Sequence, residues 1–131
     1  MTVRGLGHVN LRGSGAMIEQ LRRFYTNVMG LREGPRLTFR SGSRGYWLYA
    51  GAAAVLHLTV DDGAGTGDGP AVFDHFALEC DDLAGVRARL DAASVDYAVD
   101  TIDTLHQEQL SLTDPAGIGV ELTFTVPPAV A

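Results

Sequence analysis

The stretch VFDHFALE, residues 72–79, repeats the outline of GLGHVNL, residues 5–11, and this repetition decides the fold. Two further apolar stretches, AAVLHLTV at 53–60 and GVELTFT at 119–125, each carry one side chain that can bind a metal. Short apolar runs of this length are typical of β-strands, so we predict a strand at each of the four places. The candidate metal ligands chosen from the four stretches are His8, His57, His75 and Glu121.

The spacing of these four residues indicates one unit used twice. His8 and His57 lie 49 residues apart, and His75 and Glu121 lie 46 apart. When His8 is aligned with His75, HVNL lies over HFAL, and when His57 is aligned with Glu121, HLT lies over ELT. We therefore expect each unit to carry one such residue in its first strand and one in its last, and we expect all four to converge on a divalent metal.

The first half is predicted to follow the order strand, helix and three strands. Apolar residues recurring every three or four positions predict a helix over 16–29, begun by Ser14 as N-cap and ended by Gly30. The predicted strands of this half are 3–12, 31–39, 45–50 and 54–60.

The second half repeats this order. A helix is predicted over 83–93, capped by Asp81 or Asp82, and residues 114–117, DPAG, have the composition of a type I turn. The predicted strands are 73–80, 95–102, 108–113 and 118–125.

We therefore predict an α+β fold: one domain, 1–126, made of two βαβββ modules that form a curved mixed sheet with a concave metal-binding cleft. The modules span about 1–61 and 70–126, joined by the glycine-rich linker 62–69, and residues 127–131 form a tail.

Composition excludes several classes of protein. The net charge is −6 and no stretch combines clustered arginine with aromatic residues, so a nucleic-acid partner is not expected. No apolar run approaches the length of a membrane span, and the N-terminus lacks the apolar core of a signal peptide. The single cysteine, Cys80, cannot form an internal disulfide, which fits a reducing cytoplasmic compartment.

The motifs GHVNL, FYTNVMGLREG, FDHFALEC and DPAGIGVEL, with the hairpin WLYAG…VLHL, resemble the vicinal oxygen chelate superfamily. This superfamily includes glyoxalase I, extradiol dioxygenases and bleomycin resistance proteins, and the motifs span almost the whole chain in order. The resemblance implies metal ligands at His8, His57, His75 and Glu121. Bacterial glyoxalase I has a carboxylate at the position of His57, so this chain would supply one anionic ligand instead of two.

Imidazole and carboxylate ligands suit Zn, Ni, Co, Fe or Mn. Glu121 is the best candidate for a catalytic base, because a carboxylate can accept a proton lost beside a carbonyl group while the metal stabilises the enolate. His57 is either a fourth ligand or a base or hydrogen-bonding group beside the ion. The subset His8, His75 and Glu121 matches the two-histidine-one-carboxylate triad of ferrous oxygenases.

Other candidate residues have plain structural explanations. His106 lies in a polar turn, Cys80 is expected to pack within a strand, and Trp47 with Tyr49 forms either core or a wall of the cleft. Three arginines could reach a substrate carboxylate or phosphate, although a solvated surface is their commoner role. They are Arg36, Arg40 and Arg44.

Three functions remain open. The first is a metal-dependent lyase or isomerase acting on a small oxygenated substrate through a metal-stabilised enolate, and the second is an Fe(II) extradiol-type dioxygenase. The third is a non-catalytic small-molecule binding or resistance protein. The resemblance also implies a homodimer, with each site formed within one chain or shared between two.

Overall fold

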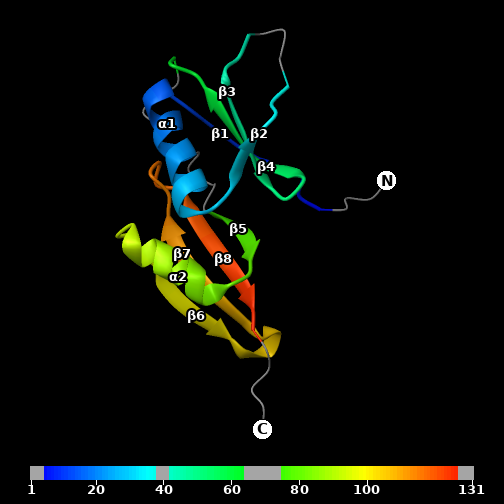
Figure 1. The fold of residues 1–131 in the computed structure, drawn as a ribbon, viewed down its shortest axis with the longest axis vertical. Coiled ribbons are helices and arrows are strands. Elements are labelled where there is room, and N and C mark those ends of the chain that lie inside the picture. Colours follow the sequence, from blue (N-terminus) through cyan, green and yellow to red (C-terminus); the bar gives the residue numbers. More distant parts are fainter. Residues whose placement is uncertain (1–4, 38–41, 64–74, 127–131) are drawn as a thin grey trace. The chain divides into compact units, whose positions relative to one another are not determined.

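The computed structural model describes residues 5–37, 42–63 and 75–126, and the chain divides into two compact units, Met1–Gly67 and Asp68–Ala131. Each unit contains one four-stranded sheet and one α-helix of nine or ten residues (Figure 1). The division falls inside the predicted linker, of which the structure describes Asp62 and Gly63, whereas the predicted tail lies outside the described residues.

The first unit forms a mixed sheet with strand order β1-β4-β3-β2. Strand β1 runs parallel to β4, and the β4–β3 and β3–β2 pairs are antiparallel. Its elements are β1 (Val9–Gly13), α1 (Gly15–Arg23), the π-helical turn η1 (Phe24–Val28), β2 (Arg32–Gly34), β3 (Gly45–Ala50) and β4 (Ala53–Val60).

The second unit repeats this topology with strand order β5-β8-β7-β6, in which β5 is parallel to β8 and the other pairs are antiparallel. The α+β class and the two βαβββ units are therefore confirmed. Its elements are β5 (His75–Cys80), α2 (Leu83–Ala92), β6 (Ala98–Ile102), the short 3-10 turn η2 (Asp103–Leu105), β7 (Gln107–Thr113) and β8 (Gly119–Thr125).

The hydrogen-bond register repeats as closely as the strand order. In the first unit His57 pairs with Asn10, two residues after His8. In the second unit Glu121 pairs with Ala77, two residues after His75. The alignment of the two halves inferred from HVNL and HFAL thus corresponds to equivalent positions in the two sheets.

Each sheet buries one face and leaves the other outside its own core. Successive side chains of a strand point to opposite faces. In β4, Leu56 and Leu58 point to the buried face, whereas the alternate residues His57 and Thr59 are only half-buried. The buried face of the first sheet packs with Ile18 and Leu21 of α1 and Tyr25 of η1. In the described part of the second unit the buried hydrophobic residues are Phe76, Val86, Leu90, Leu110, Leu112, Val120, Leu122 and Phe124.

Several predicted boundaries were wrong. Strand β1 begins at Val9 instead of residue 3, so His8 lies just before it; the glycines at 5 and 7 weaken a strand at that place. Strand β2 ends at Gly34, because Pro35 has no backbone N–H to continue the ladder. The predicted helix 16–29 changes at Phe24 into a π-helical turn, in which Met29 N–H donates to Phe24 O.

The predicted caps are present. The Ser14 hydroxyl accepts a hydrogen bond from Met17 N–H at 3.2 Å, and the Asp82 carboxylate accepts one from Gly85 N–H at 3.2 Å. Gly117 N–H donates to Asp114 O at 2.9 Å and closes the predicted turn. These local contacts fix where each helix begins and how β8 follows β7.

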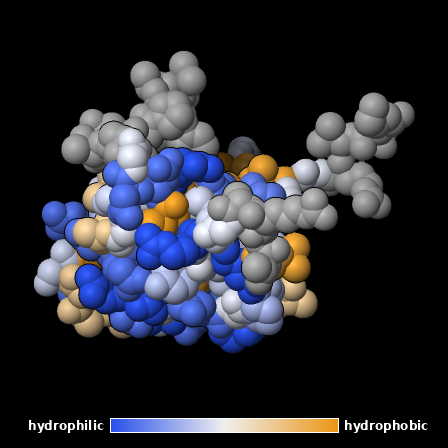
Figure 2. All heavy atoms as spheres, turned by 90° about the horizontal axis from the view of Figure 1, so that it is seen from above, coloured by the Kyte–Doolittle hydropathy of each residue, from blue (hydrophilic) through white to orange (hydrophobic). Residues whose placement is uncertain are grey.

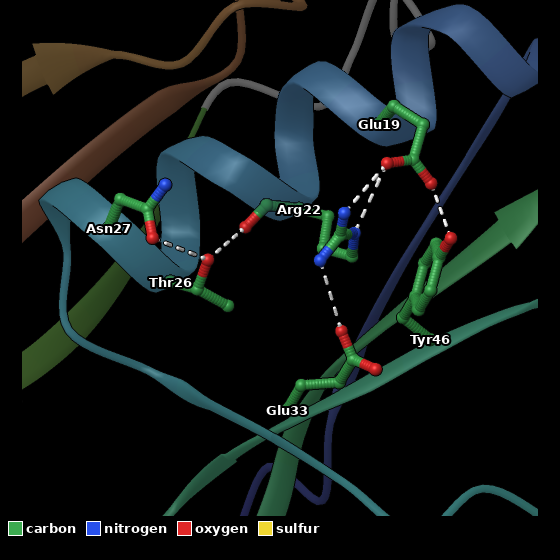
Figure 3. A network of polar contacts seen from close by, with 6 residues as sticks. All are labelled: Glu19, Arg22, Thr26, Asn27, Glu33 and Tyr46. Carbon is green, nitrogen blue, oxygen red and sulfur yellow. Dashed lines mark hydrogen bonds and ion pairs between the residues drawn. The ribbon is translucent and has the colours of Figure 1, made fainter.

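A polar network ties α1 to its sheet (Figure 3). The hydroxyl of Tyr46 on β3 donates to the Glu19 carboxylate, and Arg22 pairs with Glu19 at 2.9 Å and with Glu33 of β2 at 3.3 Å. The hydrogen bond lowers the pKa of Glu19 and raises the pKa of Tyr46. The equivalent of Tyr46 in the second unit is the buried Leu110, so the two units hold their sheets by different means.

The exposed face drawn in Figure 2 is mainly hydrophilic, with hydrophobic residues in small patches. The large apolar residues left exposed among those described are single side chains, as is usual for a folded domain. No helix in the described part of the chain has the length and hydropathy needed to cross a membrane.

Candidate functional site

A stack of three rings lies on the face of the first sheet opposite α1. The imidazole of His57 is 4.1 Å from the Trp47 ring on one side and 3.9 Å from the His8 ring on the other, measured between centroids. Trp47 is placed there because it pairs with His57 across β3 and β4. The structure thus brings together the two predicted site residues of this unit and adds Trp47, whose position as a wall was one of two predicted alternatives.

The surroundings of His57 favour its neutral form. Burial is the largest cause that lowers its pKa from 6.5, followed by the proximity of His8, and Arg36 contributes in the same direction; a backbone hydrogen bond at Ala54 opposes them. A neutral imidazole keeps a nitrogen lone pair for a metal ion or a proton.

The stack limits which rings can bind one ion. Imidazole lone pairs lie in the ring plane, and the planes of His8 and His57 are inclined by only 14° at a centroid separation of 3.9 Å. Two nearly parallel planes share no point close to both rings, so the two nitrogens cannot point at the same ion while the stack is intact. His8 is exposed at the end of the stack, whereas His57 is covered on both ring faces, so His8 is the ring with room to turn.

The second unit carries a close contact between an imidazole and a carboxylate at the equivalent place. His75 Nε2 lies 2.7 Å from Glu121 Oε2, and the side chains are 46% and 21% exposed. Both line a pocket of about 310 Å³ together with Ser111, which pairs with Glu121 as Trp47 pairs with His57.

The geometry of this pair fits a metal site. Two donors that each bind a metal at about 2.0–2.2 Å, at angles between 90° and the tetrahedral value, lie roughly 2.8–3.6 Å apart. The His75 and Glu121 donors, now 2.7 Å apart, would have to separate by less than about 1 Å to reach this spacing. Imidazole nitrogen with carboxylate oxygen is also a common donor set for zinc, nickel, iron and manganese.

Each unit supplies two of the four predicted ligands. His8 and His57 lie together in the first unit, and His75 and Glu121 lie together in the second. Within neither unit do the described residues bring three or more His, Cys, Asp or Glu side chains into one group that could hold a metal. The metal site with His8, His57, His75 and Glu121 as ligands therefore stays a prediction.

The remaining candidates have separate places. His106 is exposed at the end of η2, and burial raises the pKa of Cys80, which does not favour a reactive thiolate. Arg44 pairs with Asp62 at the surface at 3.4 Å, Arg36 lines a pocket, and Arg40 lies outside the described residues.

Sequence reasoning missed polar residues beside the predicted ligands. Asn10 and Thr59 each stand two positions after a predicted ligand, on the same face of the sheet, and the Thr59 hydroxyl donates to Asn10 Oδ1 at 2.8 Å. The alternation of a strand could have identified both, because any residue two positions from a site residue shares its face.

No family model and no curated protein matches the chain. Solved structures do. A glyoxylase/bleomycin resistance protein/dioxygenase domain from Frankia sp. EAN1pec has a TM-score of 0.72 at 21% identity over 95% of this chain and 93% of its own. A glyoxalase/dioxygenase from Nostoc punctiforme has a TM-score of 0.74 at 16% identity over 95% and 92%. Lactoylglutathione lyase from Agrobacterium tumefaciens has a TM-score of 0.66 at 19% identity over 94% and 95%.

These similarities extend over nearly the full length of both partners, so the chain has the fold of the vicinal oxygen chelate superfamily. The resemblance found in the sequence motifs is confirmed at this level. Because one fold carries many reactions, the activity has to be argued from the residues.

Proposed function

We propose that this protein is a divalent-metal-dependent enzyme with lyase or isomerase chemistry on a small oxygenated substrate. The observation that carries the proposal is the 2.7 Å contact between His75 Nε2 and Glu121 Oε2 beside a pocket of about 310 Å³. Names of glyoxalases, a lyase and a dioxygenase among structures of the same fold support this class of reaction.

His75 and Glu121 are proposed as two ligands, and His8 as the third, because it can leave the ring stack. His57 is then the neighbouring base or a fourth ligand. When bound, the ion would supply Lewis acidity that stabilises negative charge on a substrate oxygen as an enolate forms.

Glu121 is proposed to move the proton. One carboxylate oxygen, Oε2, faces His75, and the other is the one left to accept a proton from the carbon next to the substrate carbonyl. Glu121 is half-buried, so water screens its charge less than at an exposed site. His57, whose pKa is lowered mainly by burial, can accept the same proton in a second step or return it to a neighbouring carbon.

The proposal is tested by titrating metal-free protein with Zn, Ni, Co, Mn and ferrous ions in a calorimeter. We expect one site per chain, lost in His75→Ala and weakened in Glu121→Gln, and unchanged in the control His106→Ala, which removes an exposed histidine of the same unit. Equal binding by wild type and His75→Ala would contradict it, and a wild-type protein that binds no metal would favour a non-catalytic binding protein.

A second candidate, an Fe(II) extradiol-type dioxygenase, is favoured by the ring stack. Because His8 and His57 cannot both face one ion while stacked, the donor set reduces to two histidines and one carboxylate. Oxygen consumption by the iron-loaded protein with a catechol distinguishes this candidate from the first, which consumes no oxygen.

We also propose a homodimer, as the resemblance implies. Sedimentation at micromolar concentration is expected to give twice the mass of the 13.9 kDa chain. A single monomer species would contradict the dimer without bearing on the metal ligands.

A further inference from the structure

A second pocket, of about 440 Å³, opens in the first unit beside the ring stack. This volume lies within the range of roughly 300–1,000 Å³ that is typical of sites for small organic ligands. Its lining combines two guanidinium groups with amide and hydroxyl groups and one indole. The lining residues are Asn10, Arg12, Arg36, Ser43, Trp47, His57 and Thr59.

The lining of this pocket is positively charged, in a protein whose net charge is −6. Arg12 and Arg36 contribute guanidinium groups, and no carboxylate is among the described lining residues. Asp61 pairs with Arg12 at 3.1 Å and offsets part of the charge of that guanidinium.

The polar groups of the pocket are held in place. Arg36 donates to the backbone oxygen of Ser43 at 2.9 Å and to its hydroxyl at 3.2 Å, which fixes the plane of the guanidinium. The Thr59 hydroxyl donates to Asn10 Oδ1, which fixes the orientation of the Asn10 amide and so the direction of its NH2 group. Fixed N–H donors cost little to order when an anion binds.

We infer that this pocket binds a small organic oxyanion, with Arg36 and the Asn10 amide on the carboxylate or phosphate group and Trp47 against the apolar part. Guanidinium groups bind both kinds of oxyanion through paired N–H donors. The pocket is larger than an inorganic ion needs, and the indole wall favours an anion that carries an apolar group. His57 also belongs to the proposed metal site, but Asn10, Arg36 and Trp47 are not among its ligands, so anion binding can be tested in metal-free protein.

Trp47 is the only tryptophan, so its fluorescence reports directly on this pocket. Metal-free protein is titrated with benzoate, with phenyl phosphate and with the neutral analogue benzyl alcohol. We expect a saturable change with at least one of the two anions and none with the alcohol, and the tighter of the two anions identifies the charged group. Raising the salt concentration should weaken the binding.

Two arginine variants distinguish anion binding in the pocket from anion binding at the protein surface. Arg36→Gln should weaken anion binding by about 10- to 100-fold, the effect of losing a charge-assisted hydrogen bond. Arg44→Gln is the matched control, because Arg44 is 74% exposed, pairs with Asp62 and does not line the pocket. Unchanged binding by Arg36→Gln, equal loss in both variants, or equal binding of benzyl alcohol would overturn the inference.

Folding of each variant is checked by circular dichroism, since Arg36 also positions Ser43. If Arg36→Gln does not fold, Asn10→Leu replaces the amide donors with an apolar side chain of similar size at an exposed position. Binding of either anion to Asn10→Leu as tightly as to wild type would then overturn the inference, and loss of binding would support it.

Discussion

The two units share a register but not a chemistry. In the first unit His57 lies between two rings, and at the equivalent position of the second unit Glu121 contacts His75. Each of the two positions pairs with the residue two places after the first histidine of its unit. The backbone therefore fixes where the side chains stand, and the side chain opposite on the neighbouring strand decides what they do. Trp47 stacks against His57, whereas Ser111 is too small to cover Glu121, which contacts His75.

The largest expected effect tests the equivalence of the two cores. Leu58 and Leu122 each follow the second site residue of their unit, and both are almost fully buried. Replacing either by alanine should lower the free energy of unfolding by about 2–5 kcal/mol, measured by urea denaturation. A loss several-fold larger in one unit would break the comparison, and Thr125→Ala, at an exposed end of β8, is the control.

The next prediction separates the two site pairs. His75→Ala should weaken metal binding by more than about 100-fold, because it removes one of the proposed ligands. Loss of a residue that only hydrogen-bonds to a ligand typically lowers metal affinity by about 10- to 100-fold. His57→Phe keeps an aromatic ring between Trp47 and His8 but removes both nitrogens. We expect its metal affinity to stay within about tenfold of wild type. A loss as large as that of His75→Ala would show that His57 is a true ligand and that the stack opens.

A smaller effect is expected from the residues opposite the site. Trp47→Leu removes one ring contact of His57 and should cost about 0.5–1.5 kcal/mol of stability beyond the change in buried area. Ser111→Ala, at the equivalent position, should change stability by less than about 0.5 kcal/mol. Thermal unfolding of both variants measures the difference, and equal losses would mean that the stack contributes no stability of its own.

The smallest effect concerns the hydrogen bond between Tyr46 and Glu19 in the first unit; the equivalent of Tyr46 in the second unit is Leu110. The folded-state pKa of Glu19 is lowered below 4.5, so its contribution to stability is present above pH 4.5 and is lost as the pH falls through the folded value. The pKa of Tyr46 is raised above 10, so its contribution is present below pH 10 and is lost as the pH rises through the folded value. Tyr46→Phe should therefore be less stable than wild type between these limits, and the difference should shrink beyond both, as measured by urea denaturation across pH. A constant difference at every pH would contradict this account.

Much of the fold could be predicted because it depends on local signals. Alternating apolar residues located β4 and β8, and Ser14 and Asp82 located the helix starts, since these effects act within a few residues. The start of β1 was misplaced because the glycines at 5 and 7 were not weighed against the strand, and no local signal indicated the π-helical turn at Phe24.

The candidate site divides in the same way. The repeat in the sequence identified His8, His57, His75 and Glu121, and the structure pairs them within each unit. Sequence spacing cannot give the angle between two rings, so the stack that keeps His8 and His57 from sharing an ion was not foreseen. Arg36 could not be told from surface arginines, because its difference from Arg44 lies in the loop residue Ser43 that holds it.

The division between Gly67 and Asp68 has a consequence for how the protein can be produced. Every strand pair in the described residues lies within one unit, so a break at this point interrupts no strand ladder. We therefore expect that the two halves can be expressed as separate polypeptides and reassembled by fragment complementation. One half could then be isotopically labelled or mutated while the other stays unchanged.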